Sequence, residues 1–241
     1  MNRPYTICYI MTSAEGNIDG DHWRLPEAKT PWGVYNKEWE KINPDATIYG
    51  ATTVSEFASN GLVQDLPAAT KTYPREDYIA PYDVKNFYIF LDTKGTLAYK
   101  SKYIERKGRA PHAVIHVLTE DVSDSYLEYL RSNEISYIFC GKKDFDAVTM
   151  MQKAYSLFNI KTVVVGGGGL TNWTFLTSGL IDEYKVVLLP IADGDPVAHA
   201  AFHRSEGMES KPVPFTLVDA KPIDGDGLMI TYKAKNALPN E

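Results

Sequence analysis

Cysteine is scarce in this sequence, which contains only Cys8 and Cys140 among its 241 residues. Each lies in an apolar run with the composition of a buried strand, at residues 7–10 and 137–140. A lone cysteine in such a run usually packs as a small hydrophobic side chain. We therefore expect two buried thiols, with neither a disulfide nor a reactive cysteine.

Long hydrophobic runs are also missing. No apolar stretch approaches the roughly 20 residues that a membrane-spanning helix needs. The N-terminus enters a strand pattern at Tyr5 without the apolar core of a signal peptide. These two absences predict a cytoplasmic protein with no membrane partner.

The chain has no excess of positive charge. Its 25 Lys and Arg residues face 31 Asp and Glu residues, which gives a net charge of −6 and an isoelectric point near 5.4. This balance argues against nucleic acid as a partner, although a local basic pocket for a phosphorylated small molecule is compatible with it. Hydrophobic residues make up 44% of the chain, enough for an ample core.

Apolar and amphipathic segments alternate along most of the chain, which predicts the α/β class. The predicted strands are Tyr5–Met11, Ala46–Tyr49, Phe87–Leu91, Ala113–Leu118, Ile135–Cys140, Thr162–Val165, Tyr184–Leu189, Phe215–Pro222 and Leu228–Tyr232. The predicted helices are Trp32–Ile42, Thr53–Ser59, Asp124–Ser132, Asp146–Phe158 and Thr171–Thr177. The alternation favours a mostly parallel central sheet with helices on both faces, closed by an antiparallel C-terminal hairpin.

No linker, composition break or internal repeat divides the sequence. We therefore expect a single domain over residues 1–241, with a core at about residues 3–235. Two long irregular segments, at residues 16–31 and 60–85, interrupt the pattern. Long loops in a compact domain are often functional, so both are candidates for the site.

Four consecutive glycines, Gly166–Gly169, follow the β-branched run Thr162–Val165 and precede a helical pattern that begins near Leu170. Residues without a Cβ atom let main-chain N–H groups approach a phosphate closely, and the helix N-terminus adds its dipole. The run matches neither the spaced glycines of a dinucleotide fold nor a P-loop. The segment therefore predicts an anion site, and the alternative is a tight connection without a ligand.

Four motifs occur in a fixed order along the chain: Met11–Ile18 after the first strand, Gly50–Val54, Leu91–Lys94, and the glycine run continuing through Gly179–Glu183 to Pro190. Together they resemble the reductase domain of bacterial riboflavin biosynthesis enzymes, within the dihydrofolate-reductase-like superfamily. The resemblance implies that fold, NADPH as the cofactor and a homodimeric assembly. It also implies hydride transfer to the ribosyl C1 of 5-amino-6-(5-phosphoribosylamino)uracil, an early step in riboflavin biosynthesis.

Under this resemblance, two glycine turns at the carboxyl ends of strands would straddle the cofactor pyrophosphate. Thr93 and Lys94 would hold the 2′-phosphate that distinguishes NADPH from NADH, because a hydroxyl beside a cation suits a dianion. Lys94 could equally be an ordinary solvated turn residue. The expected cofactor-binding residues are Gly50, Thr52, Thr53, Thr93, Lys94, Gly166, Gly167, Gly168, Gly169 and Leu170.

The substrate end is expected in the 16–31 loop and its surroundings. His22 could donate a proton as the ribose ring opens, since the pKa of histidine lies in the useful range, or it could be a solvated loop residue. Glu15 replaces the family aspartate and is interpreted first as a turn-stabilising carboxylate and second as a catalytic group. The expected catalytic residues are Glu15 and His22, and the expected substrate-binding residues are Ser13, Trp23, Phe57 and Arg75.

Three positions depart from the family pattern. Gly166 stands where the family has glutamate, and Phe57 replaces an aspartate. The Leu-x-x-Arg segment that binds the ribose phosphate in the family has no clear counterpart, and Arg75 is the nearest basic residue. An apolar Phe57 favours a different or less polar substrate. The alternatives are a same-fold reductase of a pterin-like or carbonyl compound, and a non-catalytic nucleotide-binding paralogue.

Two weaker hypotheses arise from the remaining residues. A dihydrofolate reductase proper would need an acidic residue on the first helix, where Glu38 and Glu40 are the candidates. His199 and His203 have helical spacing for metal ligands, but no carboxylate or cysteine completes the set locally. We therefore expect no metal site.

Overall fold

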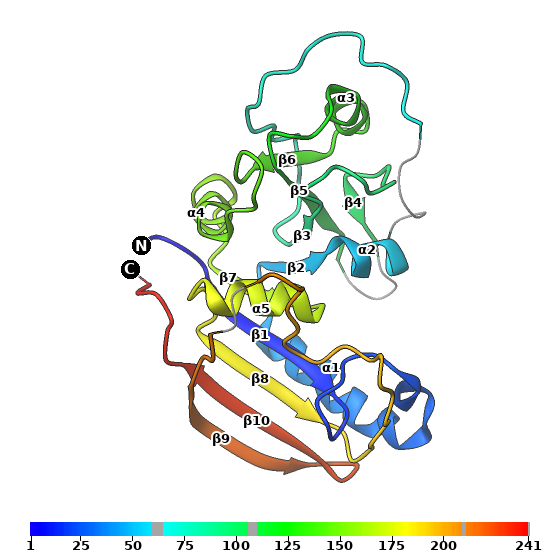
Figure 1. Cartoon of the computed structure of the whole chain (residues 1–241), viewed down its shortest axis with the longest axis vertical. Helices are drawn as coiled ribbons and strands as arrows, with labels where there is room; N and C mark the ends of the chain where they lie inside the picture. The colour runs from blue at the N-terminus through cyan, green and yellow to red at the C-terminus, as the bar shows by residue number, and fades with distance from the viewer. Residues whose placement is uncertain (59–64, 106–109, 209–210, 241) are drawn as a thin grey trace. The chain divides into compact units, whose positions relative to one another are not determined.

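The computed structural model describes residues 1–58, 65–105, 110–208 and 211–240. The chain divides into two compact units: unit 1 comprises residues 1, 5–44 and 162–241, and unit 2 comprises residues 2–4 and 45–161. Each of them contains both helices and strands (Figure 1). Among the described residues, no helix has the length and apolar character needed to cross a membrane.

The sheet of unit 1 has the strand order β7-β1-β8-β10-β9. Its members are β1 (Tyr5–Thr12), β7 (Thr162–Val165), β8 (Glu183–Leu188), β9 (Phe215–Ile223) and β10 (Gly227–Ala234). β1 is parallel to β7 and β8, whereas β10 runs antiparallel to β8 and β9. Strand β1, which is apolar apart from Thr6 and Thr12, is almost entirely buried, as expected for a parallel strand covered on both faces.

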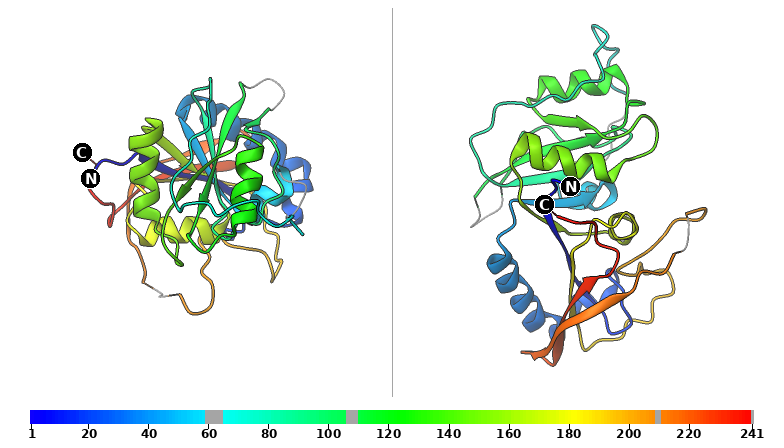
Figure 2. Two further views of the ribbon diagram at one scale, coloured as in Figure 1. Left: turned by 90° about the horizontal axis from the view of Figure 1, so that it is seen from above. Right: turned by 90° about the vertical axis from the view of Figure 1, so that its left-hand side faces the viewer.

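Helix α1 (Lys29–Ile42) covers one face of this sheet and α5 (Gly169–Thr177) lies on the other side (Figure 2). On the α1 face, the rings of Tyr9 and Tyr35 stack with centroids 4.3 Å apart. On the other face, Ile10 packs with Ala201 in a smaller cluster. Two short 3-10 helices, Asp21–Arg24 and Pro26–Ala28, lie between β1 and α1.

Unit 2 contains β2 (Ala46–Gly50), β3 (Phe87–Leu91) and β5 (His112–Leu118), which are parallel neighbours. The beginning of β5 also pairs antiparallel with β4 (Tyr103–Ile104), and its end pairs in parallel with β6 (Ser136–Phe139). The register places Gly50 opposite Leu91. The carboxyl ends of β2 and β3 are therefore adjacent.

The helices of unit 2 are α2 (Ala51–Phe57), α3 (Asp124–Ser132) and α4 (Ala147–Phe158), and Figure 1 shows α3 and α4 on opposite sides of the strands. Side-chain oxygens cap two of them, because Ser123 accepts a hydrogen bond from Tyr126 N, and Asp146 accepts from Val148 N and Thr149 N. These caps satisfy first-turn donors and fix where both helices begin.

The predicted α/β class, the parallel strands, the helices on both faces and the antiparallel C-terminal hairpin are confirmed. Strand β4 and the two 3-10 helices inside residues 16–31 were not predicted. Part of the irregular segment expected at residues 60–85 lies outside the described residues. The single domain over residues 1–241 stays a prediction. Cys8 and Cys140 are buried free thiols as expected, and burial raises the pKa of Cys140 to about 12.

Candidate active site

The glycine run of unit 1 connects β7 to α5 and has two structural roles. Gly167 has a φ of 102°, a conformation that side chains with a Cβ rarely adopt. Gly168 is the N-cap of α5 and no side chain caps the helix, so the first turn of α5 presents main-chain donors. The segment before α5 therefore has the local features of a backbone-built anion site.

Gly169, in contrast, is required for packing. A Cβ atom at this position would lie 2.3 Å from the Ala200 carbonyl oxygen and 2.9 Å from His203 Cβ. His203 N donates to the Gly169 carbonyl at 3.1 Å, and Asn172 Nδ2 donates to the Ala201 carbonyl at 2.7 Å. The segment around residues 200–203 is thus held against the beginning of α5, and the four glycines are not equivalent.

Replacing Gly169 with alanine is expected to destabilise the protein by about 1–3 kcal/mol, the usual cost of overpacking. The new methyl group would push on the Ala200 carbonyl, which is backbone and cannot rotate away. Chemical denaturation of both proteins measures the difference. Leu170→Ala is the control, because that side chain is 44% exposed and its loss is expected to change stability by less than about 0.5 kcal/mol.

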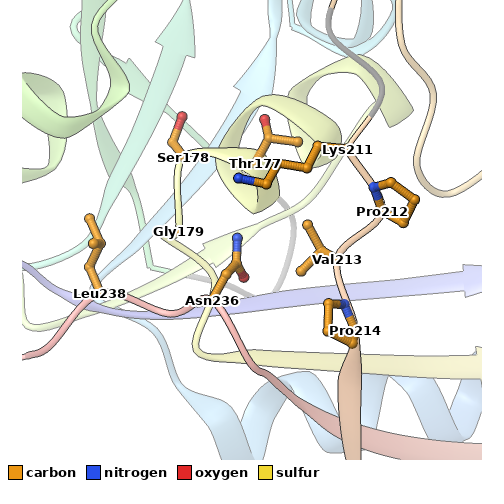
Figure 3. Close-up of a pocket in the computed structure, with 9 residues that line it drawn as sticks. All are labelled: Thr177, Ser178, Gly179, Lys211, Pro212, Val213, Pro214, Asn236 and Leu238. Atoms are coloured by element: carbon orange, nitrogen blue, oxygen red, sulfur yellow. The ribbon is translucent and has the colours of Figure 1, made fainter.

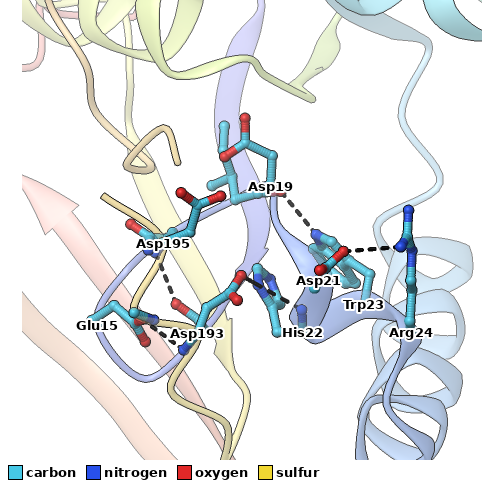
Figure 4. A network of polar contacts seen from close by, with 12 residues as sticks. Glu15, Asp19, Asp21, His22, Trp23, Arg24, Asp193 and Asp195 are labelled. Carbon is cyan, nitrogen blue, oxygen red and sulfur yellow. Dashed lines mark hydrogen bonds and ion pairs between the residues drawn. The ribbon is translucent and has the colours of Figure 1, made fainter. Parts of the chain in front are cut away.

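A second cluster in unit 1 contains His22, which lies in the 3-10 helix Asp21–Arg24 and is buried. Its Nδ1 is 2.7 Å from Asp193 Oδ2, and Trp23 packs with its ring centroid 4.9 Å from that of His22 (Figure 4). Trp23 Nε1 donates to the Ile18 carbonyl at 3.1 Å. The Nε2 atom of His22 is buried and has no hydrogen-bond partner within the described residues. An imidazole held at one nitrogen and free at the other is suited to proton transfer.

Glu15 holds the turn that carries Asp193. Its Oε1 accepts hydrogen bonds from Asp193 N and Gly194 N, both at 2.7 Å. The hydrogen bond from Gly194 N, with further ones around the carboxylate, lowers the pKa of Glu15 to about 2. Nearby, buried Ser13 accepts from Asn17 N through its hydroxyl at 3.1 Å. Glu15 therefore stabilises a turn, and its catalytic role stays a prediction.

Lowering the pH through the range from 4.5 to about 2 is expected to remove the stabilisation from Glu15, because its folded pKa is depressed below the ordinary value. The contribution is complete above pH 4.5 and is lost as the folded carboxylate becomes protonated. Urea unfolding of the wild type and of Glu15→Gln across this range measures it. The two proteins should converge towards pH 2, and a constant difference at every pH would contradict the prediction.

Asp193 was not predicted as a site residue. It lies 171 positions after His22 in the sequence, and only its position in an Asp-Gly-Asp turn soon after a predicted strand could have drawn attention to it. A Cβ atom on Gly20 would lie 1.8 Å from Asp193 Oδ2. Gly20 is therefore required because the Asp193 carboxylate occupies the space beside it.

The remaining predicted residues belong to unit 2. Gly50 ends β2 and is the N-cap of α2, so Thr52 and Thr53 lie in the first turn of that helix. Phe57 ends α2, is 39% exposed and packs edge to face against Tyr49 with ring centroids 5.0 Å apart. Because β2 and β3 are parallel neighbours, these residues share a sheet edge with the turn that follows β3.

Thr93 and Lys94 lie in that turn, which Gly95 N closes by donating to the Asp92 carbonyl at 2.8 Å. Thr93 is half-buried and Lys94 is exposed. Within the part of the chain that the structure describes, Lys94 makes no ion pair. A hydroxyl and a free ammonium group thus occupy neighbouring positions at the ends of the unit 2 strands.

Arg75 anchors the loop that precedes β3. Its guanidinium donates to three backbone carbonyls, those of Glu120 at 3.0 Å, Tyr73 at 2.8 Å and Val122 at 2.8 Å. It also pairs with the Asp124 carboxylate, and this hydrogen bond lowers the pKa of Asp124. Arg75 therefore ties its loop to the beginning of α3, and its substrate-binding role stays a prediction.

The structure thus places Ser13, Glu15, His22, Trp23, the glycine run and Leu170 in unit 1. It places the other expected cofactor-binding and substrate-binding residues in unit 2. Among the candidates for an acid on α1, Glu38 is paired with Lys185 at 2.8 Å and with Lys41 at 3.2 Å. His199 pairs with Asp19 at 2.6 Å. No group of three metal-ligating side chains occurs among the described residues.

A cavity of about 270 Å³ also lies in unit 1, beyond the C-terminal end of α5 (Figure 3). It is lined by Thr177, Ser178, Gly179, Lys211, Pro212, Val213, Pro214, Asn236 and Leu238. None of the predicted site residues belongs to this lining. The cavity is therefore separate from both the glycine run and the His22 cluster.

Comparison with known proteins gives a family match. The family model described as the RibD C-terminal domain matches residues 4–228. Among solved structures, a pyrimidine reductase-like protein from Corynebacterium diphtheriae superposes with a TM-score of 0.68 at 13% identity, covering 96% of this chain and 92% of that one. The riboflavin biosynthesis reductase of Saccharomyces cerevisiae gives 0.57 at 15% identity, with 96% and 90% covered.

A bifunctional diaminohydroxyphosphoribosylaminopyrimidine deaminase and 5-amino-6-(5-phosphoribosylamino)uracil reductase from Thermotoga maritima is also similar. It gives a TM-score of 0.59 at 16% identity. The match covers 96% of this chain and 57% of that protein, so this chain spans a little over half its length. These superpositions confirm the fold that the sequence motifs predicted.

Proposed function

This chain belongs to the RibD C-terminal domain family, and on that premise we propose that it is an NADPH-dependent reductase of 5-amino-6-(5-phosphoribosylamino)uracil. The family supports the broader assignment as an oxidoreductase that acts on a small molecule. The observation that carries the proposal is the family match over residues 4–228, which includes the glycine run of unit 1 and the strand ends of unit 2. The identity of the cofactor, the identity of the substrate and the dimeric state are what we propose beyond this broader assignment.

The residues present fit a phosphorylated dinucleotide. Gly167 adopts a conformation that suits glycine, and the first turn of α5 has no side-chain cap to compete with a phosphate. In unit 2, Thr52 and Thr53 place hydroxyls at the beginning of α2, and Lys94 is unpaired within the described chain. From the sequence motifs of each unit taken separately, we propose the main-chain donors of unit 1 for the pyrophosphate and Thr93 and Lys94 of unit 2 for the 2′-phosphate.

NADPH, when bound, supplies the hydride that the ribosyl C1 accepts. The protein then needs a group that donates a proton to the ribose ring oxygen while the bond between C1 and that oxygen breaks. We assign this role to Nε2 of His22 in its protonated form. Asp193 accepts from Nδ1 at 2.7 Å, which orients the ring and leaves Nε2 as the nitrogen available to the substrate.

A second candidate function is reduction of a less polar substrate, such as a pterin-like or carbonyl compound. Phe57 favours it, because an apolar side chain that is 39% exposed stands where the riboflavin reductases carry a carboxylate. A non-catalytic nucleotide-binding paralogue would bind the cofactor without oxidising it.

Two measurements separate these functions. Titration of the protein with NADPH and with NADH, followed by nicotinamide fluorescence, tests cofactor binding. NADPH oxidation with the phosphoribosylaminouracil, dihydrofolate and simple carbonyls then identifies the substrate. Absence of binding at millimolar cofactor would reject the reductase, and binding without oxidation of any of these substrates would favour the paralogue.

We also propose a homodimer, because β9 presents Leu217 and Val218 to solvent at 57% and 52% exposure. Light scattering after gel filtration tests the oligomeric state. The expected location in the cytoplasm stays a prediction.

A further inference from the structure

A buried polar cluster in unit 2 is not used by the chemistry above. It consists of Asp92 directly after β3, His116 in β5 and Tyr126 in α3, each no more than 1% exposed. Tyr126 Oη donates to Asp92 Oδ2 at 2.5 Å, and His116 Nδ1 lies 3.2 Å from the same oxygen. We call these three residues the Asp92 cluster.

The Asp92 carboxylate is directed into the protein and surrounded by donors. Its Oδ1 accepts from Thr96 N at 2.7 Å and from Thr96 Oγ1 at 3.0 Å, and its Oδ2 also accepts from Leu97 N at 3.2 Å. Burial raises the pKa of Asp92, but the hydrogen bonds from His116, Tyr126 and Thr96 outweigh it, and the net shift is downwards. The carboxylate therefore stays ionised while its oxygens are occupied by protein groups.

These contacts fix the backbone of the turn that carries Thr93 and Lys94. Gly95 N donates to the Asp92 carbonyl at 2.8 Å, which closes the turn. Thr119 holds the Thr93 carbonyl from the other side, through its N at 3.1 Å and its Oγ1 at 2.8 Å. The turn is thus held at its beginning, its middle and its end.

The ring of Tyr126 also packs against this turn, at Gly95. Gly95 has a φ of 66°, and a Cβ atom there would lie 2.5 Å from Tyr126 Cδ1. Tyr126 therefore both contacts the turn and hydrogen-bonds the carboxylate that braces it. Lys94, in contrast, is exposed. The buried side of the turn is therefore occupied by hydrogen bonds within the protein, and its outer side is available to a ligand.

We infer that the Asp92 cluster is a positioning group that sets the selectivity for a 2′-phosphorylated nicotinamide cofactor. A carboxylate at the end of a strand often accepts a hydrogen bond from the ribose 2′-hydroxyl of NADH. Here the carboxylate is turned inward, so the turn offers a hydroxyl and an ammonium group instead. A cation held in a fixed turn binds a phosphate dianion with little ordering cost. This inference rests on the proposed function.

The test uses Tyr126→Phe, which removes one hydrogen bond to Asp92 but keeps the ring, and Asp92→Asn, which removes the charge. Dissociation constants for NADPH and NADH are measured by nicotinamide fluorescence, together with the melting temperature of each protein. We expect Tyr126→Phe to weaken NADPH binding about fivefold or more, in line with one charge-assisted hydrogen bond, and to leave NADH binding within about twofold. The preference for NADPH over NADH should fall accordingly.

Two lysine variants calibrate the measurement. Lys94→Ala should lower NADPH affinity about tenfold and leave NADH affinity unchanged, because only NADPH carries the 2′-phosphate. Lys85→Ala is the matched control, since this exposed lysine precedes β3 and therefore lies at the opposite end of the same strand. It should change neither constant.

The outcomes distinguish the inference from the function on which it rests. If the wild type prefers NADPH and both Asp92 cluster variants keep that preference, the inference is overturned and the reductase proposal stands. If the wild type binds neither cofactor, the proposed function fails and the inference fails with it. Should Asp92→Asn not fold, Tyr126→Phe decides alone, because a role in stability without positioning would weaken both cofactors equally.

Discussion

Replacing His22 with glutamine is expected to lower kcat for the phosphoribosylaminouracil by about 100-fold to 10,000-fold, the usual contribution of general acid catalysis. Glutamine keeps a polar side chain at this position but has no titratable group. The dissociation constant of NADPH should stay within about twofold, because His22 is assigned to proton donation and not to cofactor binding. Steady-state kinetics with saturating NADPH, together with fluorescence titration, give both numbers.

His199→Gln is the matched control for this prediction. His199 also pairs with an aspartate, Asp19, at 2.6 Å, but both side chains are at least half exposed. Its replacement should leave kcat unchanged, and so the buried pair can be compared with an exposed one of the same composition. A His22→Gln enzyme with the kcat of the wild type would show that His22 is a structural residue of the loop. Asp193→Asn should lower kcat by a smaller factor, because it leaves the imidazole in place.

Replacing Gly167 with valine is expected to reduce NADPH and NADH affinity by at least about tenfold. The substitution puts a β-branched side chain on a residue with a φ of 102°, which costs of order 1–3 kcal/mol and displaces the main chain that is assigned to the pyrophosphate. Both cofactors share the pyrophosphate, so their affinities should fall together. This pattern differs from that of Lys94→Ala, which affects NADPH alone.

Gly207→Val separates loss of the site from general backbone strain. Gly207 also has a positive φ, 85°, and a Cβ atom there meets no atom of the described residues within 4 Å. The control should therefore carry a comparable conformational cost and retain cofactor affinity. Folding of each variant is checked by circular dichroism. Retained affinity in a folded Gly167→Val protein would show that the glycine run is not the pyrophosphate site.

The elements of the fold were largely predictable because their signals are local. The β-branched run Thr162–Val165 is strand β7 at the predicted residues, and the predicted helix Asp124–Ser132 is α3, which Ser123 caps. Hydrophobic periodicity and capping are properties of a few consecutive residues. Strand β4 was missed because two residues carry no periodicity, and its existence depends on pairing with β5.

The candidate site was predictable only where a motif is continuous in the sequence. The glycine run was found in this way, but the separate requirement for Gly169 comes from Ala200 and His203, more than 30 positions further on. Asp193 was missed because its contact with His22 joins residues that lie 171 positions apart in the sequence. Similarly, the sequence marks Asp92 only as the residue after a strand, whereas its burial against His116 and Tyr126 depends on how β5 and α3 pack.

The sequence by itself determined the α/β class, the order of strands and helices, and membership of a reductase family, because these depend on periodicity and on short motifs. Tertiary structure decided which polar groups are paired and which are left available. The tertiary structure brings His22 within hydrogen-bond distance of Asp193, buries the Asp92 carboxylate among protein donors and leaves Lys94 exposed. The physical reason is that a hydrogen bond or a close contact requires atoms within a few ångströms, and chain folding alone brings residues so distant in sequence to that separation.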